Sequence, residues 1–248
     1  MTVNNEKQLS KLLRIGKICG TALKMMQEAV KPGITTAELN DIGARYLHQQ
    51  GARPAPILTY NFPGATCISI NDEAAHGIPG DRVIQPGDLV NVDVSAELDG
   101  YFADCGGSVA VPPVRTEDQH LCDYTLAALD AAINAVSANR PLYVIGQAVE
   151  GVARKGGYNV IRELSGHGVG RSLHEEPRHV PNFFSKRAKQ PLTEGMVLTL
   201  EPFLTRGVGK VVTADDGWTL KTINGTRACQ YEHTVMITRG KPLLVTAV

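Results

Sequence analysis

Two aspartates lie close to a tight turn in the middle of the chain. Asp93 precedes the dipeptide Asp99-Gly100, a strong signal for a two-residue β-hairpin, and Asp104 follows it. A hairpin closed on that turn sets Asp104 opposite Ser95, on the strand face that also carries Asp93. The two carboxylates are then diagonal neighbours, about 7–8 Å apart by backbone, and they repel each other unless a cation joins them. The hairpin alone leaves two interpretations open: a metal site, or two solvated aspartates on an exposed face.

A histidine surrounded by glycines is the next candidate. His167 lies within Ser165-Gly-His-Gly-Val-Gly170, where the glycines allow the backbone to approach a ligand closely. Imidazole is a common ligand of transition metals. The alternative is a glycine-rich turn in which the histidine is incidental. A nucleotide-binding loop is poorly supported, because the spacing is not Gly-x-Gly-x-x-Gly and no Gly-Lys-Ser/Thr is present.

A second histidine follows seven residues later. His174 opens a His-Glu-Glu-Pro segment that invites comparison with the His-Glu-x-x-His zinc helix. The comparison fails, because Arg178 stands where the second histidine would be and Pro177 would break the helix. We therefore expect His174 to reach the cleft of His167 from a loop.

Two glutamates lie in apolar, strand-like sequence near the C-terminal end. Glu201 ends the run Val197–Leu200, and Glu232 lies within Gln230–Val235. Each alone could form a structural ion pair, because a buried charge needs a partner. Together the candidates offer four carboxylates and one imidazole, a set without thiolates that suits two ions of Mn, Co, Fe or Zn better than one structural zinc. The predicted metal ligands are Asp93, Asp104, His167, Glu201 and Glu232.

Helices and strands must position these side chains. Apolar periodicity, a capping box and alanine-rich sequence predict helices at Glu6–Ala29, from Thr35 to about Gly51, at Glu117–Ala138 and at Val144–Lys155. Strands are expected at Thr66–Asn71, Leu89–Leu98, Tyr101–Ala110, Asn159–Leu164, Met196–Phe203, Ala228–Thr238 and Leu243–Thr246, and a Pro- and Gly-rich loop up to Ala65.

The order helix, helix, strands occurs twice and suggests an internal repeat. Asp93 and Glu201 each close an apolar strand, with an offset of 108 residues. Gly87 and Gly195, each just before its strand, share that offset. The repeat predicts one α+β domain of two similar halves that deliver carboxylates from matching strand ends.

Composition excludes several other classes of protein. The 25 basic and 25 acidic residues balance, so no basic excess is available to bind nucleic acid. The polar N-terminus does not resemble a signal peptide, and no apolar run approaches the roughly 20 residues that span a bilayer. Five widely spaced cysteines without Cys-x-x-Cys argue against a disulfide framework. We expect a soluble cytoplasmic protein with a single catalytic domain over residues 1–248, its halves spanning roughly 1–115 and 116–248.

In this order and spacing, the segments resemble the type I methionine aminopeptidases. The resemblance runs over nearly the whole chain and rests on Cys67–Asn71, His76–Pro79, Asp93, Asp104, Ser165–Pro177, Glu194–Pro202, Asp216–Trp218 and Gln230–Val235. It implies the pita-bread fold, in which an antiparallel sheet is flanked by two helix pairs with internal pseudo-twofold symmetry. It also implies removal of the initiator methionine from nascent chains whose second residue is small.

The resemblance assigns a role to each metal ligand. Asp93, Asp104 and Glu232 are similar to carboxylates that are shared between, or contact, two divalent ions. His167 and Glu201 are similar to ligands of one ion, and Glu201 would also act as the general base. Thr199 shares a strand face with Glu201, and Thr234 shares one with Glu232. Each threonine could therefore donate a hydrogen bond to its neighbouring ligand.

The substrate contacts follow from the same resemblance. His76 would lie near the scissile nitrogen and His174 near the carbonyl oxygen. Phe62, Cys67 and Trp218 are the candidates for the pocket of the methionine side chain, together with His76, although each could equally be core packing.

Four residues depart from the family pattern around that pocket. Leu173 stands where an aromatic side chain is common, Cys105 stands where threonine is expected, and Thr59 and Tyr60 replace the usual tyrosine arrangement. These differences leave the metal ligands intact and bear on the strictness for methionine.

Two rival functions remain open at this point. One is a non-catalytic protein of the same fold that binds peptides or the ribosome, and the other is a Pro-directed dipeptidase. The complete ligand set argues against the first, and the short segment before Cys67 argues against the second. The expected partners of the enzyme are nascent N-termini, with the ribosome as a further candidate, no nucleic-acid site, no membrane, and a monomeric state.

Overall fold

The computed structural model describes residues 1–248, which form five helices and fourteen strands. The helices are α1 (Glu6–Ala29), α2 (Thr36–Gln49), α3 (Ala55–Tyr60), α4 (Thr116–Ala135) and α5 (Tyr143–Lys155). The strands are β1 (Arg53–Pro54), β2 (Cys67–Ile70), β3 (Glu73–Ala75), β4 (Leu89–Leu98), β5 (Tyr101–Ala110), β6 (Asn159–Val160), β7 (Ser165–Gly168), β8 (Glu175–Pro181), β9 (Val197–Leu200), β10 (Phe203–Thr205), β11 (Val211–Thr213), β12 (Leu220–Thr222), β13 (Ala228–Met236) and β14 (Leu243–Leu244).

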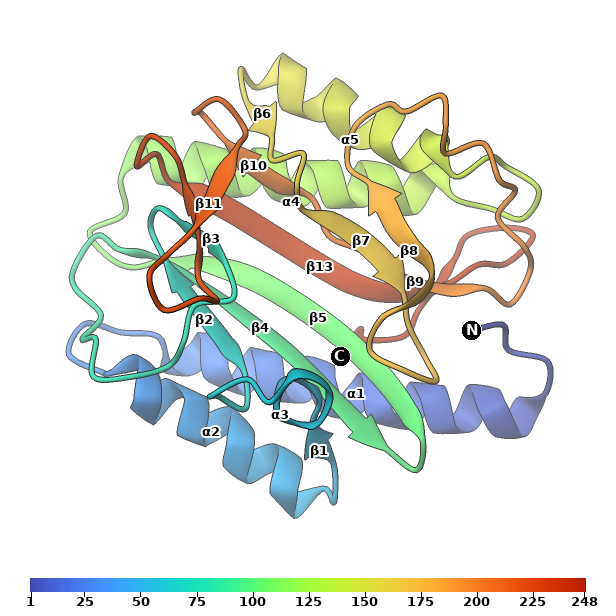
Figure 1. The fold of residues 1–248 in the computed structure, drawn as a ribbon, viewed down its shortest axis with the longest axis horizontal. Helices are drawn as coiled ribbons and strands as arrows, with labels where there is room; N and C mark the ends of the chain where they lie inside the picture. Colours follow the sequence, from blue (N-terminus) through green and yellow to red (C-terminus); the bar gives the residue numbers. More distant parts are fainter.

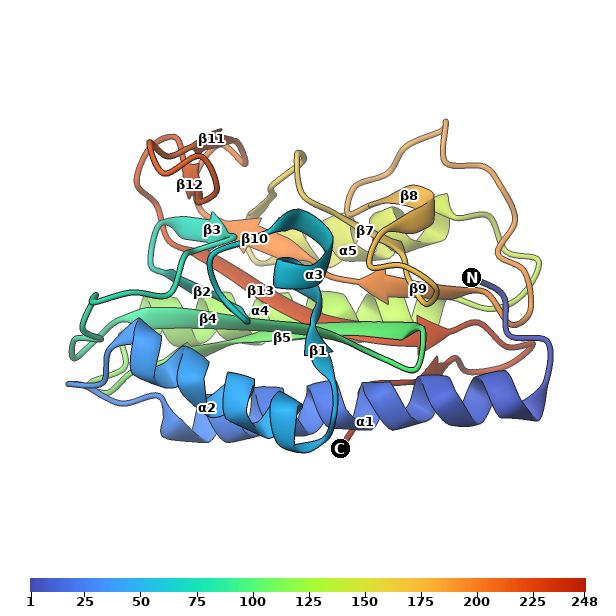
Figure 2. The same ribbon diagram turned by 60° about the horizontal axis from the view of Figure 1, so that its bottom comes forward.

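An antiparallel sheet of eleven strands crosses the middle of the molecule (Figure 1). Its main path runs β1-β4-β5-β13-β9-β7-β8, so that β5 and β13, from opposite halves of the chain, are neighbours at its centre. A separate three-stranded sheet, β11-β12-β3, lies above the large sheet in Figure 2. The two halves of the chain therefore meet along one strand pair.

Two helix pairs cover the sheet. Helix α1 packs on β4 and β5 and pairs with α2, whereas α4 packs on β13 and pairs with α5 (Figure 1). Each pair has its own core beneath it, with 24 buried residues in the first cluster and 23 in the second. The two cores are of nearly equal size, as the predicted pseudo-twofold arrangement requires. No helix has the combination of length and apolar character that a membrane crossing demands.

Side chains cap the first turns of α1 and α2, and the cap of α2 is the capping box that the sequence predicts. Asn5 caps α1 by accepting a hydrogen bond from the Gln8 amide. Thr35 and Glu38 form the reciprocal capping box of α2. Such caps satisfy amide groups that the first turn of a helix leaves without partners.

The internal repeat has a backbone counterpart. Gly87 and Gly195 both have a φ of +80°, a left-handed conformation that glycine adopts without steric cost. Isolated bridges Thr35↔Val83 and Pro141↔Pro191 join the start of each pair's second helix to the segment before the matching strand. The similarity of the halves therefore includes the turns that aim β4 and β9.

Several expectations about the elements were wrong. The strand expected at Met196–Phe203 is divided at Glu201-Pro202 into β9 and β10, and the short strands β1, β3, β7, β11 and β12 were not anticipated. The segment before Ala65 contains α3, because Pro56 preorganises a first helical turn and Asn61 ends it in a left-handed conformation. The strand expected at Asn159–Leu164 stops at Val160, and the rest of that segment turns and packs into a third small core. Strand β8 was not anticipated, since prolines at positions 177 and 181 obscure its pattern.

Candidate active site

One cavity of about 370 Å³ is lined by residues of α3, of β8 and of the turn before β12. Helix α3 and strand β12 lie on the opposite side of the large sheet from α1 (Figure 2). Every residue that the sequence singled out as a ligand or substrate contact lines it: Phe62, Cys67, His76, Asp93, Asp104, His167, His174, Glu201, Trp218 and Glu232. Residues separated by up to 170 positions therefore face the same space.

The hairpin places the two aspartates as the alternation of side chains predicts. Strands β4 and β5 pair in the expected register, with Ser95 opposite Asp104. The Thr234 hydroxyl accepts a hydrogen bond from the Asp104 amide and donates one to its carbonyl oxygen. The prediction that Thr234 supports Glu232 was therefore wrong, because its hydroxyl is used by the neighbouring strand.

Glu232 lies on β13 beside the aspartates and is held by an amide. Gln230 donates a hydrogen bond of 2.9 Å to Glu232 Oε2 and accepts one of 2.7 Å from Asn91. The Gln230 side chain lies over Gly106, where a β-carbon would come within 2.5 Å of it. Gly106 thus leaves the room that the amide needs to orient the carboxylate.

His167 and Glu201 come from adjacent strands and share one threonine. The Thr199 hydroxyl donates to Glu201 Oε1 at 2.9 Å and accepts from the His167 amide at 3.1 Å, which confirms the expected contact of Thr199 with Glu201. His167 Nδ1 donates to the Gly168 carbonyl oxygen, which can only accept. His167 Nε2 is therefore the bare nitrogen, and it points toward the carboxylates. Asn182 holds the Glu201 backbone oxygen at 2.9 Å.

The four carboxylates are in a strongly unfavourable environment for negative charge. Burial raises the pKa of Asp93 to about 7. Burial and the charges of Asp93 and Glu201 raise the pKa of Asp104 well above its ordinary value. Burial, followed by the charges of the other acids, does the same to Glu201 and Glu232. Groups shifted in this way ionise readily only when a positive charge joins them.

The geometry fits a cation. Ligand atoms of Asp104, His167 and Glu232 all lie within 4.8 Å of one another. Asp104 Oδ1 and Glu232 Oε1 are buried without a hydrogen-bond partner. The bare His167 Nε2 lies 3.7 Å from Asp104 Oδ2 and 3.6 Å from Glu201 Oε1, beyond hydrogen-bonding distance. Lone pairs that converge without hydrogen atoms between them are the donor set of a divalent metal.

The second histidine stacks on the first. The rings of His174 and His167 lie 3.9 Å apart by centroid, and Tyr60 Oη lies 2.7 Å from His174 Nδ1. Partial burial and the positive charges of neighbours lower the pKa of His174 to about 4, so the ring is neutral at pH 7. The loop that carries it is held at Glu175, which accepts a hydrogen bond of 2.7 Å from the amino group of Met1.

His76 reaches the cavity from a strained backbone position. Its φ of +56° lies in the left-handed region, where residues with a β-carbon are uncommon. The next residue, Gly77, donates its amide to the Ser69 hydroxyl, and the His76 carbonyl accepts from Thr219 at 3.5 Å. Contacts on both sides therefore hold His76 in this conformation.

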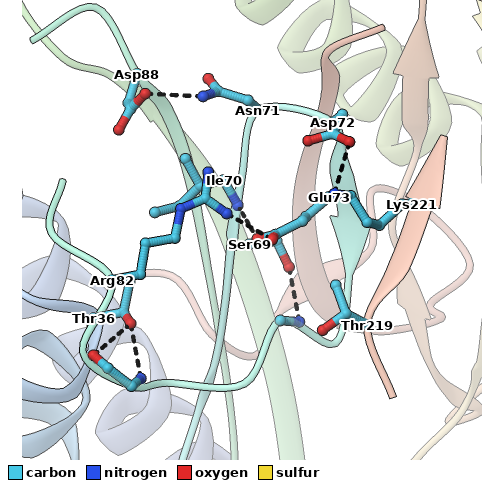
Figure 3. A network of polar contacts seen from close by, with 12 residues as sticks. Thr36, Ser69, Ile70, Asn71, Asp72, Glu73, Arg82, Asp88, Thr219 and Lys221 are labelled. Carbon is cyan, nitrogen blue, oxygen red and sulfur yellow. Dashed lines mark hydrogen bonds and ion pairs between the residues drawn. The ribbon is translucent and has the colours of Figure 1, made fainter. Parts of the chain in front are cut away.

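A polar network holds the whole segment around His76 (Figure 3). Arg82 pairs with Glu73 Oε1 at 2.6 Å, and Glu73 Oε2 accepts from the Ile70 amide. The Thr36 hydroxyl exchanges two hydrogen bonds with the Gly80 backbone. The segment between β2 and β4 is thus joined to the start of α2 by the Thr36 side chain and by backbone hydrogen bonds, such as that from the Thr36 amide to the Arg82 carbonyl oxygen.

Two further contacts in Figure 3 hold the start of that segment. Asp72 forms an ion pair of 3.1 Å with Lys221 on β12, and Asn71 donates a hydrogen bond of 2.8 Å to Asp88. The small sheet and the large sheet are joined at this point.

An apolar pocket adjoins the carboxylates. Phe62 and Trp218 meet edge to face with centroids 5.3 Å apart. Phe62 and Cys67 are buried, and Cys67 faces Asp93 across the β2–β4 ladder. Asp216 accepts hydrogen bonds from the amides of Trp218 and the following residue, which fixes the turn that presents the indole.

Sequence reasoning missed two residues of the site. Tyr60 was noted only as a departure from the family pattern, yet its hydroxyl contacts His174 across 114 residues of chain. Asn182 was not considered at all. Both residues lie in short segments without apolar periodicity, so no sequence pattern indicated the contact of Tyr60 with His174 or of Asn182 with Glu201.

Comparisons with known proteins agree with this geometry. The sequence profile of metallopeptidase family M24 matches residues 10–239. The methionine aminopeptidase of Staphylococcus epidermidis is 44% identical over 252 residues, which cover 100% of this chain and 99% of the relative. The structures of methionine aminopeptidase from Rickettsia prowazekii and Thermotoga maritima superimpose with TM-scores of 0.94 and 0.96, at 34% and 30% identity, and cover 100% of both chains. The α+β pita-bread fold predicted from the sequence is confirmed.

Proposed function

The chain belongs to metallopeptidase family M24, and we propose that it removes the N-terminal methionine from polypeptides whose second residue is small. The observation that carries this proposal is the convergence of four buried carboxylates and a bare imidazole nitrogen beside an apolar, aromatic pocket. The polar cluster supports hydrolysis of an amide, and the pocket supports selection of an apolar side chain.

The five polar residues of the cavity are the proposed metal ligands. Asp93, Asp104, His167, Glu201 and Glu232 would hold two divalent ions, with Co, Mn, Fe and Zn as the candidates. The chemistry supplied by such ions is activation of a water molecule and polarisation of the scissile carbonyl.

Side chains of the protein supply the remaining steps. Glu201 lines the cavity, and Thr199 fixes its carboxylate, so it is placed to accept the proton of the attacking water. The neutral ring of His174 is a hydrogen-bond donor for the substrate carbonyl oxygen, which becomes more negative in the transition state. His76 is assigned to the scissile nitrogen. Phe62 and Trp218 line the cavity, where their rings can contact the methionine sulfur, and contacts between sulfur and aromatic rings are favourable.

The biological setting follows from this substrate. We assign nascent N-termini as the substrates, the cytoplasm as the compartment and the ribosome as a partner to be tested. A monomer with one catalytic domain over residues 1–248 is sufficient, because both halves of the site come from one chain.

A peptide assay tests the proposal. Purified protein loaded with Co or Mn should release methionine from Met-Ala-Ser and lose this activity after chelation. It should not cleave a control peptide in which a residue other than methionine precedes proline. Asp104→Ala should abolish turnover and leave the folded state intact by circular dichroism. Binding of Met-Ala-Ser without any release of methionine would favour the non-catalytic alternative.

A further inference from the structure

The two stacked histidines of the site differ in the partner of Nδ1. In His167 this nitrogen faces the Gly168 carbonyl oxygen at 3.0 Å, so it must carry the hydrogen, and Nε2 is left bare. In His174 the same nitrogen faces the Tyr60 hydroxyl at 2.7 Å. The partner of one ring nitrogen decides which tautomer a neutral histidine adopts.

A hydroxyl can donate or accept, so the chemistry of the two groups must decide. The lone pairs of a phenol oxygen are delocalised into the ring, which makes the oxygen a weak acceptor and its hydrogen a good donor. A bare imidazole nitrogen is a strong acceptor. The Tyr60 hydroxyl makes no other hydrogen bond within the protein, and 2.7 Å is the short distance expected of a strong O–H···N contact.

We propose that Tyr60 is a positioning residue that donates its hydroxyl hydrogen to His174 Nδ1 and thereby keeps the hydrogen of the neutral ring on Nε2. The two histidines then hold opposite tautomers. His167 has a bare Nε2 that faces the proposed metal site, and His174 has an Nε2–H group that faces the substrate. This inference rests on the proposed function, because the substrate carbonyl is the group that receives the N–H.

The position of Tyr60 supports such a role. It is the last residue of α3, and its ring meets that of His174 edge-on at 5.6 Å while lining the same cavity. Because its side chain is 47% exposed, loss of the hydroxyl should leave the fold intact. A tyrosine that only formed the cavity wall would act through its ring, so Tyr60→Phe separates the two roles.

Kinetics provide the first test. Tyr60→Phe should lower kcat for Met-Ala-Ser about three- to tenfold with little change in KM, which corresponds to one hydrogen bond. Combined with His174→Gln, it should add no further loss, since the two changes would remove the same interaction. Tyr46→Phe, a matched change outside the cavity, should have no effect. An unchanged kcat, an effect on KM alone, or a full additional loss in the double variant would overturn the proposal.

A spectroscopic readout does not depend on turnover. Long-range ¹H–¹⁵N correlations of ¹⁵N-histidine-labelled, metal-free protein distinguish the two neutral tautomers, and the His174 signals are identified by their loss in His174→Gln. They should show hydrogen on Nε2 in the unchanged protein and a mixture of tautomers in Tyr60→Phe. Hydrogen on Nδ1 in the unchanged protein would overturn the proposal. If the protein released no methionine at all, the proposed function would fail, while this spectrum would still report the direction of the hydrogen bond.

Discussion

The floor and the wall of the cavity are built in different ways. The floor consists of the five proposed metal ligands, which project from strands of the large sheet or leave it at a strand end: Asp93, Asp104, His167, Glu201 and Glu232. The wall consists of cavity residues from α3, turns and loops, which are proposed to contact the substrate or to position a residue that does: Tyr60, Phe62, His76, His174 and Trp218.

The supports of the two regions differ as well. Backbone ladders set the positions of the floor residues, and buried hydrogen bonds from Thr199, Thr234 and Gln230 hold them there. Ion pairs and turns that water can reach hold the wall, as at Arg82–Glu73 and at Asp216. Buried networks break at high cost, whereas exposed ion pairs contribute little. The proposed metal ligands are thus held by buried ladders and hydrogen bonds, and the proposed substrate contacts are held largely by exposed ion pairs and turns.

The largest expected effect is on the floor. Asp104→Asn keeps the shape of the side chain but removes one negative charge from the cluster. Replacing a residue that only hydrogen-bonds to a metal ligand typically lowers activity roughly 10- to 100-fold, so turnover should fall by more than that when a proposed ligand is changed. The peptide assay and metal analysis check this.

A control for that variant lies on the same hairpin. Asp99→Asn changes an exposed aspartate at the turn, where asparagine tolerates the left-handed backbone, and should leave activity within twofold. Comparable losses of turnover in Asp99→Asn and Asp104→Asn would mean that activity depends on folding of the hairpin and not on the charge of Asp104 in the cavity.

The next effect is on the apolar part of the wall. Phe62→Leu removes one ring of the edge-to-face pair with Trp218, so kcat/KM for a methionine peptide should fall about tenfold. Metal content should be unchanged, because no floor residue is altered. Phe184→Leu, a half-exposed phenylalanine outside the cavity, is the matched control. Loss of metal in Phe62→Leu would contradict the separation of floor from wall.

A smaller effect concerns the stability of the metal-free protein. Burial raises the pKa of Asp93 to about 7 and those of Asp104, Glu201 and Glu232 well above their ordinary values, whereas carboxyls of an unfolded chain titrate near pH 4. The folded state therefore binds more protons than the unfolded state at neutral pH. By linkage, its free energy of unfolding must fall as pH rises through that range.

The measurable consequence is a change in Tm. Buried histidines act in the opposite sense, but their contribution decreases above the ordinary histidine pKa of about 6.5, so the carboxylates dominate the interval from pH 7 to 8. Chelated protein should lose a few degrees of Tm over this interval, since about 1 kcal/mol shifts Tm by 2–4 °C in a chain of this size. Metal-loaded protein should lose less, because the cation favours the ionised carboxylates. A flat Tm in chelated protein would show that the acids are not desolvated.

The same division governs how much the sequence could predict. The positions of Asp93 and Asp104 could be predicted, because strand alternation and the Asp99-Gly100 turn determine the register that joins them. The other floor residues were proposed from their local sequence and from family resemblance, and the structure places them in the same cavity. The wall residues other than Tyr60 were predicted through family resemblance, and the structure places them in the cavity, where their roles stay predictions. The role of Thr234 was misassigned, since its strand face was right but its hydroxyl is taken by the backbone of Asp104.

Helix α3 and the Tyr60–His174 contact illustrate why the rest was out of reach. Six residues are too few to show helical periodicity, and three nearby prolines favour a loop. Tyr60 and His174 are 114 residues apart and belong to no common ladder. Their contact depends on how α3 packs, and this packing cannot be predicted from the local sequence.

The smallest expected effect is at the outer edge of the wall. Arg82 is 44% exposed and pairs with Glu73 at 2.6 Å, and Glu73 also accepts the Ile70 amide at the start of the segment that carries His76. Arg82→Gln should cost less than about 1 kcal/mol of stability, because water screens the pair and Glu73 keeps its second contact. If the network positions His76, kcat should still fall about twofold while metal content stays constant, and 0.5 M salt should reduce the unchanged protein to the same rate. A loss as large as that of Asp104→Asn would show that a side-chain network in solvent can hold the site as firmly as a buried ladder, and the contrast between floor and wall would then be wrong.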